Sequence, residues 1–298
     1  MIIAIVGPTG VGKTALSIAL AQELHTEIIS GDSIQVYRGM DIGSAKITPE
    51  EMAGIPHHLL DILDPKEEFS VAVFQSMVRD KITDFQKREL TPLIVGGTGL
   101  YIKSVLYDYD FTDAKRDPDL AAQYESCSNE ELYAQLEIKD KKATNKIHPN
   151  NRKRVIQALI RSDTNKVGDN TNKDVPLYDF IIIGLKLDRQ TLYQRINDRV
   201  DQMMEMGLEE EMKHLYHKGL SKTAKQAIGY KEWIPYLNGT ATKEEVVEAI
   251  KQHSRNLAKK QYTFFEHQFP VHWIDVDTQQ FDNTIQNALE LLRKEGVL

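Results

Sequence analysis

The sequence predicts an α/β fold, in which a P-loop parallel-sheet core is flanked by helices and carries a mostly helical insertion domain. Three observations lead to this prediction. Short apolar runs rich in β-branched residues recur along the chain, as is typical of strands buried on both faces of a parallel sheet. Stretches with apolar residues at helical spacing separate these runs. A complete phosphate-binding motif follows the first run, between a predicted strand and a predicted helix.

The first of these segments holds the motif. Ile2 to Val6 predict a buried strand, Gly7 to Thr14 match G-x-x-x-x-G-K-[ST], and Ala15 to Leu24 predict a helix with one buried face. Glycines let backbone N–H groups approach an anion, and the helix N-terminus adds positive potential. We therefore expect a bound di- or triphosphate rather than a chance glycine-rich turn. The candidate diphosphate-binding residues are Gly7, Pro8, Thr9, Gly10, Val11, Gly12, Lys13 and Thr14, with Lys13 on the phosphates and the Thr14 hydroxyl as the metal ligand for Mg2+.

The second predicted strand, Glu27 to Ser30, leads to Asp32. A carboxylate at the carboxyl end of a parallel strand lies where open α/β sheets bind ligands, although aspartate also commonly caps loops. Position alone favours neither alternative. The polar and glycine-rich stretch from Ser33 to Lys46 is too long for a simple turn, so we expect a functional loop. His57 to Leu63 is a candidate for a short third strand.

A long amphipathic helix is predicted from Ser70 to Leu90, followed by a buried strand from Pro92 to Val95. Many P-loop NTPases place a magnesium-holding aspartate after such a strand. Here the chain continues with Gly96, Gly97 and Thr98. This weakens the ATPase and GTPase interpretations and suggests that the backbone closely approaches a ligand.

Residues 112–176 lack any buried-strand pattern and predict a mostly helical insertion, so the core comprises 1–111 and 177–298. Helical segments are expected near Glu130 to Leu136 and Val155 to Ile160. The basic run from Arg152 to Arg154 is by default a solvated helix terminus. The sharper alternative is a contact with a nucleic-acid backbone.

The core resumes with a predicted buried strand, followed by helices, a last strand and a closing helix. The expected ranges are a strand at 180–185, helices at 189–207, 208–220 and 243–265, a strand at 271–276 and a helix at 283–293. Arg255 and Lys259 lie one turn apart on the long helix and share a face.

Composition sets further limits on function. The chain has 298 residues, of which 41% are hydrophobic, and its net charge of −7 argues against wholesale electrostatic binding to nucleic acid while allowing local basic patches. Cys127 is the only cysteine, so no intrachain disulfide is possible. No apolar run suits a signal peptide or a membrane span. We expect a cytoplasmic protein that does not enter the membrane.

Several motifs together resemble the tRNA dimethylallyltransferase (tRNA isopentenyltransferase) family, along nearly the whole chain. The P-loop alone is shared by many families, whereas the run from Asp32 to Lys46 and the segment from Val95 to Tyr101 are specific to few. The remaining carriers are His57-His58-Leu59, Asp61 to Pro65, Ile147 to Asn150, Gln226 to Glu232 and Ala258 to Gln261.

The resemblance implies that the dimethylallyl group of dimethylallyl diphosphate moves to the exocyclic N6 amine of the adenosine 3′ to the anticodon, with release of diphosphate. The partners would be the anticodon stem-loop of tRNA and the prenyl donor, with Mg2+ as cofactor, and the enzyme would act as a monomer. Asp32 would accept the amine proton, and Thr98 would lie close to the chemistry. Lys13 and Arg255 would stabilise charge on the departing diphosphate.

The resemblance also implies an RNA-binding set, in which the target base leaves its stack to reach the site. Its members are Asp32, Ser33, Ile34, Gln35, Thr98, Lys153, Arg154, Gln226, Gly229, Tyr230, Lys259 and Lys260. The sequence departs from relatives at Ala121, where an arginine is frequent, and at Lys260, Phe264 and Glu266. Two alternatives stay open: a P-loop kinase in which Asp32 activates a substrate hydroxyl, and a non-enzymatic, nucleotide-dependent RNA-binding switch.

Overall fold

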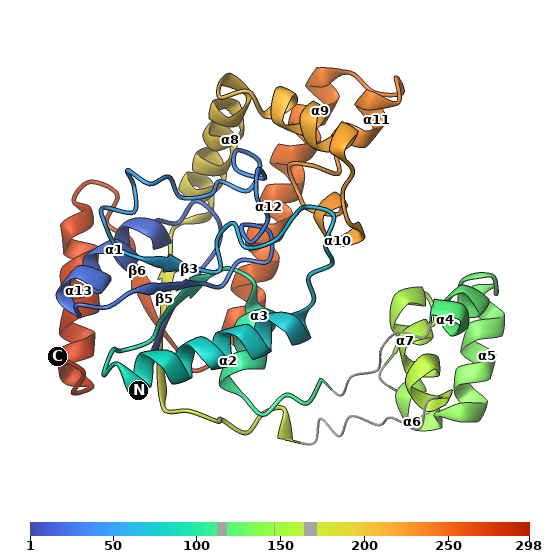
Figure 1. The fold of residues 1–298 in the computed structure, drawn as a ribbon, viewed down its shortest axis with the longest axis horizontal. Coiled ribbons are helices and arrows are strands. Elements are labelled where there is room, and N and C mark those ends of the chain that lie inside the picture. The colour runs from blue at the N-terminus through green and yellow to red at the C-terminus, as the bar shows by residue number, and fades with distance from the viewer. Residues whose placement is uncertain (112–117, 146, 164–171) are drawn as a thin grey trace. The chain divides into compact units, whose positions relative to one another are not determined.

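A computed structural model describes residues 1–111, 118–145, 147–163 and 172–298 (Figure 1). The chain divides into two compact units, Met1–Tyr107 with Pro176–Leu298, and Asp108–Val175. The first unit is an α/β core built on a six-stranded sheet, as the sequence predicted. No helix of the described residues is long and apolar enough to cross a bilayer.

All strands of the sheet are parallel, in the order β3-β2-β4-β1-β5-β6. Their bounds are β1 Ile2–Val6, β2 Ile28–Ser30, β3 His57–His58, β4 Leu93–Gly96, β5 Phe180–Lys186 and β6 Val271–Asp275. The register aligns the carboxyl ends of the central strands, because Val6 lies opposite both Gly96 and Gly184. Loops that follow β1, β2 and β4 therefore emerge at one edge of the sheet.

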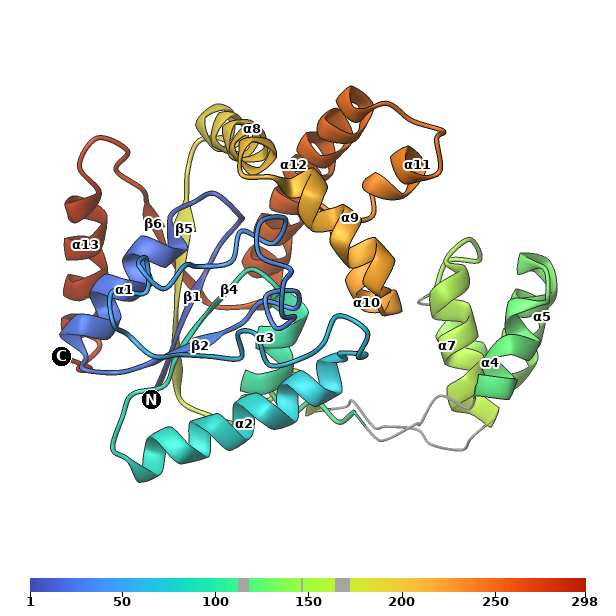
Figure 2. The same cartoon turned by 45° about the horizontal axis from the view of Figure 1, so that its top comes forward.

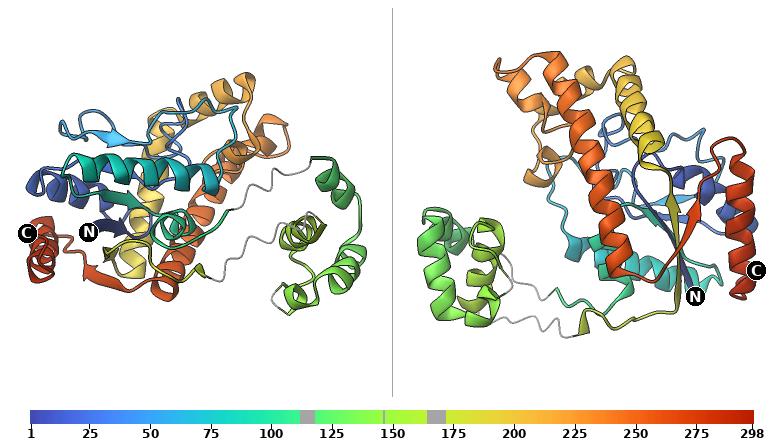
Figure 3. Two further views of the ribbon diagram at one scale, coloured as in Figure 1. Left: turned by 60° about the horizontal axis from the view of Figure 1, so that its bottom comes forward. Right: turned by 180° about the vertical axis from the view of Figure 1, so that it is seen from behind.

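Helices cover both faces of this sheet, and Figure 3 shows the strands between the long α12 and the C-terminal α13. The core helices are α1 Lys13–Glu23, α2 Val71–Lys87, α3 Gly99–Leu106, α8 Arg189–Glu205, α9 Leu208–Lys218, α10 Lys222–Lys225, α11 Trp233–Leu237, α12 Lys243–Gln268 and α13 Phe281–Lys294. Local signals start several of them. Thr242 and Glu245 form a reciprocal capping box at α12, and the Ser70 hydroxyl accepts a hydrogen bond from Val73 N–H at α2.

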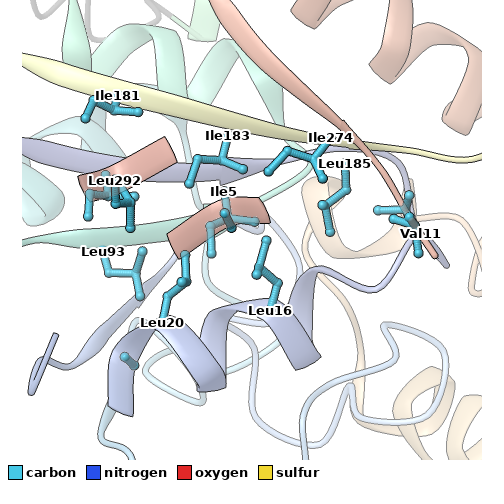
Figure 4. Packing of buried hydrophobic residues seen from close by; sticks show 14 of the residues in the cluster. Ile5, Val11, Leu16, Leu20, Leu93, Ile181, Ile183, Leu185, Ile274 and Leu292 are labelled. Atoms are coloured by element: carbon cyan, nitrogen blue, oxygen red, sulfur yellow. The ribbon is translucent and has the colours of Figure 1, made fainter. Parts of the chain in front are cut away.

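The main hydrophobic cluster packs α1 and α13 against one face of the sheet (Figure 4). Alternate residues of the central strands point into it, among them Ile3, Ile5, Ile181, Ile183 and Leu185. Every residue of β1 is buried, because its remaining side chains face the opposite layer of helices. The continuous apolar runs in the sequence thus reflect strands covered on both sides.

The expected third strand is much shorter than predicted. Only His57 and His58 pair with β2, although we expected a strand up to Leu63. Leu59 and Asp61 adopt positive φ values of 60° and 52°, which take the chain out of the extended conformation. Pairing returns only at an isolated bridge between Leu63 and Tyr37.

The second unit is helical in its described residues (Figure 2). It contains α4 Pro118–Glu125, α5 Asn129–Lys139, α6 Lys141–Thr144 and α7 Arg152–Asp163. Its core is small and is formed by Tyr124, Leu132, Leu136, Val155 and Leu159 together with a few neighbours. Residues 112–117, 146 and 164–171 of the predicted insertion lie outside the described residues.

Candidate active site at the carboxyl edge of the sheet

Three neighbouring strands deliver the candidate catalytic groups to one edge. The P-loop follows β1, Asp32 follows β2 and Thr98 follows β4, and β4 lies between the other two strands. The Gly31 N–H donates to the Val95 carbonyl at 2.7 Å, so the two segments that carry Asp32 and Thr98 run side by side. Open α/β sheets bind ligands at this edge.

The P-loop adopts the strained backbone that its glycines permit. Gly7, Gly10 and Gly12 have φ values of 145°, 81° and 105°, a region that disfavours residues with a Cβ atom. The Lys13 ammonium donates to the carbonyls of Gly7 at 3.0 Å and Pro8 at 2.8 Å. Thr14 is exposed in the first turn of α1. The loop therefore presents a cation, a hydroxyl and a helix N-terminus together, which suits an anion.

Burial, together with the nearby positive charge of Arg199, lowers the pKa of Lys13 to about 8. Asp32 acts in the opposite direction, because its negative charge favours the protonated lysine. Arg199 lies on α8 and its guanidinium donates to the Thr9 hydroxyl at 3.4 Å. The phosphate loop is thus surrounded by more positive charge than its own sequence supplies.

The structure shows one of the two roles that the sequence position of Asp32 left open, that of a turn residue. Its Oδ1 accepts hydrogen bonds from the N–H groups of Ile34 at 2.8 Å and Gln35 at 3.2 Å, which makes it a turn residue. Oδ1 therefore fixes the loop, and Oδ2 has no hydrogen-bond partner within the part of the chain that the structure describes.

Thr98 is the N-cap residue of α3, but its hydroxyl does not cap the helix. The glycines that precede it are packed closely against other parts of the chain. A Cβ atom on Gly96 would lie 2.5 Å from the Gly31 carbonyl oxygen, and one on Gly97 would lie 2.3 Å from the Gln261 amide nitrogen. The close approach that these glycines allow in the structure is therefore to the protein's own chain.

Gln261 of α12 connects two parts of the site. Its Oε1 accepts from Thr9 N–H at 3.2 Å, and its Nε2 donates to the Gly97 carbonyl at 3.0 Å. Phe264, one turn further on, lies against Gly99, where a Cβ atom would clash at 2.2 Å. The long helix thereby fixes the phosphate loop relative to the turn that carries Thr98.

Comparisons with known proteins match this architecture. The chain matches the model of the IPP transferase family over residues 35–268 and that of isopentenyl transferases over residues 1–65. It is 50% identical to a tRNA dimethylallyltransferase of Anoxybacillus flavithermus, covering 98% of this chain and 96% of the relative. The corresponding enzyme of Bacillus subtilis is 49% identical over 99% of this chain and 94% of its own length. The chain belongs to the tRNA dimethylallyltransferase family.

Solved structures of the family agree with this assignment. A full-length tRNA isopentenylpyrophosphate transferase of Bacillus halodurans superposes with a TM-score of 0.77 at 45% sequence identity. The match covers 98% of this chain and 95% of that chain. A eukaryotic dimethylallyltransferase, captured while acting on tRNA, has a TM-score of 0.85 at 29% identity, with 99% of this chain and 79% of that chain covered.

The candidate RNA-binding residues of the core unit, which the family resemblance suggested, fall into three surroundings. A first group is partly exposed at the carboxyl edge of the sheet and comprises Asp32, Ser33, Ile34, Gln35 and Thr98. Gln226, Lys259 and Lys260 are exposed, and the two lysines line an open groove of about 580 Å³ on α12 together with Asn256, Thr263, Phe264, His267 and Gln268. Gly229 and Tyr230 are buried, so they could influence RNA only through the groups that they contact.

The basic run of the insertion unit contains one residue that is hydrogen-bonded within the unit and two that are exposed. The Arg152 guanidinium donates to the Asn129 side chain at 2.9 Å and to the carbonyls of Glu125 at 2.8 Å and Cys127 at 2.7 Å. Arg152 therefore joins the start of α7 to the turn between α4 and α5. Lys153 and Arg154 are exposed at the same helix end.

Arg255 and Arg199 have different contacts in the structure. Arg255, the arginine that we expected beside the leaving group, donates to Asn197 Oδ1 on α8 at 2.5 Å. Arg199, which the sequence reasoning did not single out, contacts the P-loop itself. No local signal distinguishes Arg199 from Arg189 and Arg195 of the same helix, because α8 meets the loop only in the tertiary structure.

Proposed function

We propose that this protein transfers the dimethylallyl group of dimethylallyl diphosphate to the N6 amine of the adenosine 3′ to the anticodon in tRNA. The bond between N6 and the dimethylallyl carbon forms, the carbon–oxygen bond to diphosphate breaks, and the amine loses a proton. The observation that carries the proposal is that three features lie at one edge of the sheet. They are the P-loop, the Asp32 carboxylate with only Oδ1 hydrogen-bonded among the described residues, and Thr98, whose hydroxyl does not cap α3. Membership of the family supports it.

Each chemical requirement has a candidate group in this chain. Lys13, Arg199 and the N–H groups of the P-loop supply positive potential for the diphosphate that leaves. Asp32 Oδ2 would accept the proton of the weakly basic aromatic amine. Thr98 would bind the donor or the amine through its hydroxyl. Arg255 would act at longer range, through α8.

Magnesium fits this site as a partner of the substrate. The described residues contain no cluster of three or more His, Cys, Asp or Glu side chains that could hold a metal. Mg2+ is often held by one or two protein oxygens together with substrate phosphates and water. The exposed Thr14 hydroxyl offers one such oxygen at the P-loop. When bound, the ion would stabilise negative charge on the diphosphate.

The direct test is to incubate the protein with unmodified tRNA and dimethylallyl diphosphate, and to analyse the nucleosides by mass. Diphosphate release with and without ATP is followed in parallel, beside phosphate release from ATP alone. We expect a prenylated adenosine and stoichiometric diphosphate without any need for ATP. ATP hydrolysis stimulated by tRNA, with no diphosphate from the donor, would instead favour the kinase or the switch.

The lowered pKa of Lys13 predicts a pH dependence of donor binding. Only the protonated lysine attracts the diphosphate, so affinity should be constant well below pH 8 and should fall as the pH rises through about 8. Above pH 8 the donor affinity should fall by up to about tenfold per pH unit. The fall should end at the pKa that Lys13 has in the donor-bound protein. Calorimetric titration with an unreactive thio analogue of the donor, on both sides of pH 8, measures this. Lys13→Arg stays charged, so a Lys13→Arg variant with the same fall would contradict the assignment.

The insertion unit supplies a prediction about RNA affinity. If Lys153 and Arg154 contact phosphates, replacing both by alanine should weaken tRNA binding and reduce the slope of log affinity against log salt by about 1–2. Arg152 stays unchanged in this variant, because it joins helices of the unit. Lys141→Ala with Lys142→Ala removes equal charge from another exposed part of the unit. Equal slopes for the two double variants would mean that only net charge matters.

A further inference from the structure

Glu211 of α9 makes an unusual set of contacts outside the chemistry described so far. Its Oε2 accepts from the N–H groups of Asp41 at 2.9 Å and Ile42 at 2.7 Å, and its Oε1 accepts from Gly43 N–H at 3.0 Å. Successive N–H groups that converge in this way form an anion-binding concavity, called a nest. Here the anion is a side chain of the protein, 168 to 170 positions further along the chain.

Buried groups fix the other side of this contact. The Tyr230 hydroxyl donates to Glu211 Oε1 at 2.8 Å, and its ring is fully buried. Burial and the charge of Glu211 raise the pKa of Tyr230 well above its usual value, so the hydroxyl keeps its proton. A Cβ atom on Gly43 would lie 2.7 Å from the Tyr230 ring, and one on Gly229 would lie 2.9 Å from the Gly43 carbonyl oxygen. The nested segment therefore has no room to shift toward this side.

Hydrogen bonds continue from the nested segment to the catalytic edge. The Gln35 side-chain amide donates to the carbonyls of Ser44 and Ala45, both at 3.2 Å. The Gln35 N–H in turn donates to Asp32 Oδ1. At the far end of the loop, the Lys46 ammonium donates to the Tyr37 carbonyl at 2.7 Å and to Asp41 Oδ1 at 2.5 Å. The loop from Ser33 to Lys46 is thus held at its start, its middle and its end.

We propose that Glu211 is a positioning residue for the RNA substrate, which acts by holding the loop from Ser33 to Lys46 in the conformation that presents Asp32 and Gln35 to the target adenosine. This inference rests on the proposed function. None of the hydrogen bonds of the P-loop passes through Glu211 within the described residues. Replacing Glu211 should therefore change the kinetic parameters for tRNA and leave the affinity for the prenyl donor unchanged.

Glu211→Gln tests this most directly. The amide keeps the size of the carboxylate, but its NH2 group would face N–H donors and release part of the nest. Glu210→Gln is the matched control, because Glu210 is the exposed neighbour on the same helix and loses the same charge. The measurements are kcat and KM for tRNA, calorimetric binding of the thio analogue of the donor, thermal unfolding, and amide hydrogen exchange over residues 41–45.

We expect kcat/KM for tRNA to fall by about 10–100-fold in Glu211→Gln, as misplacement of reacting groups by about 1 Å can cause. Donor affinity should stay within about twofold of the wild-type value, a negligible free-energy change. Exchange at residues 41–45 should accelerate, and Glu210→Gln should behave as wild type. Unchanged kcat/KM, or a parallel loss of donor affinity, would overturn the inference. Absence of prenyl transfer in the wild type would instead refute the proposed function.

Discussion

Replacing Asp32 by asparagine is expected to lower kcat for dimethylallyl transfer by about 10²–10⁴, the usual range for loss of a general base. Asparagine keeps an Oδ1 that can accept from the N–H groups of Ile34 and Gln35, so the turn should survive. Its NH2 group cannot accept the amine proton. Affinity for tRNA should therefore change little, and single-turnover kinetics at saturating donor and tRNA measure the loss.

Asp32→Ala is the comparison that separates the two roles of this residue. Alanine removes both the base and the turn, so we expect it to lose at least as much activity as asparagine and also to weaken tRNA binding. If the Asp32→Asn variant kept near-normal turnover while the Asp32→Ala variant did not, Asp32 would be a turn residue only. The proton would then leave through another group.

Replacing Lys13 by alanine is expected to reduce the rate of prenyl transfer by about 10²–10³, as removal of other preorganised electrostatic groups does. The ammonium is held at the P-loop by the Gly7 and Pro8 carbonyls, close to where a diphosphate would bind. Negative charge on the departing oxygen grows in the transition state, so kcat should fall in addition to donor affinity.

Single-turnover rates at saturating donor distinguish these effects for Lys13. Lys13→Arg restores the charge in a different shape and should recover part of the rate. A Lys13→Ala variant that lost only donor affinity, with an unchanged rate at saturation, would show that the lysine binds ground state and transition state equally. The P-loop would then be a binding site without a catalytic role for its lysine.

The sequence predicted the elements of the core well, because each depends on a local pattern. The buried strands at β1, β4 and β5 follow from short apolar runs, and the P-loop follows from fixed glycine spacing. The third strand was predicted too long, because positive φ values at Leu59 and Asp61 are set by the surrounding loop and leave no mark on hydrophobic periodicity.

The site was predicted only in part. The positions of Lys13, Asp32 and Thr98 at one edge follow from parallel strands whose carboxyl ends align. The basic run from Arg152 to Arg154 looked uniform, but the structure engages Arg152 within the helical unit and leaves Lys153 and Arg154 exposed. That difference depends on the turn between α4 and α5, which is remote from the run in the sequence.

By itself, then, the sequence determined which segments become strands and helices, where the P-loop lies and which strand ends carry chemical groups. Only the tertiary structure decided how those groups are fixed. Gln261 reaches Thr9 across 252 positions, Arg199 reaches the same residue across 190, and Glu211 reaches Gly43 across 168. The physical reason is that hydrophobic periodicity and turn chemistry act over a few residues, whereas these hydrogen bonds form only after α8, α9 and α12 have packed against the sheet and its loops.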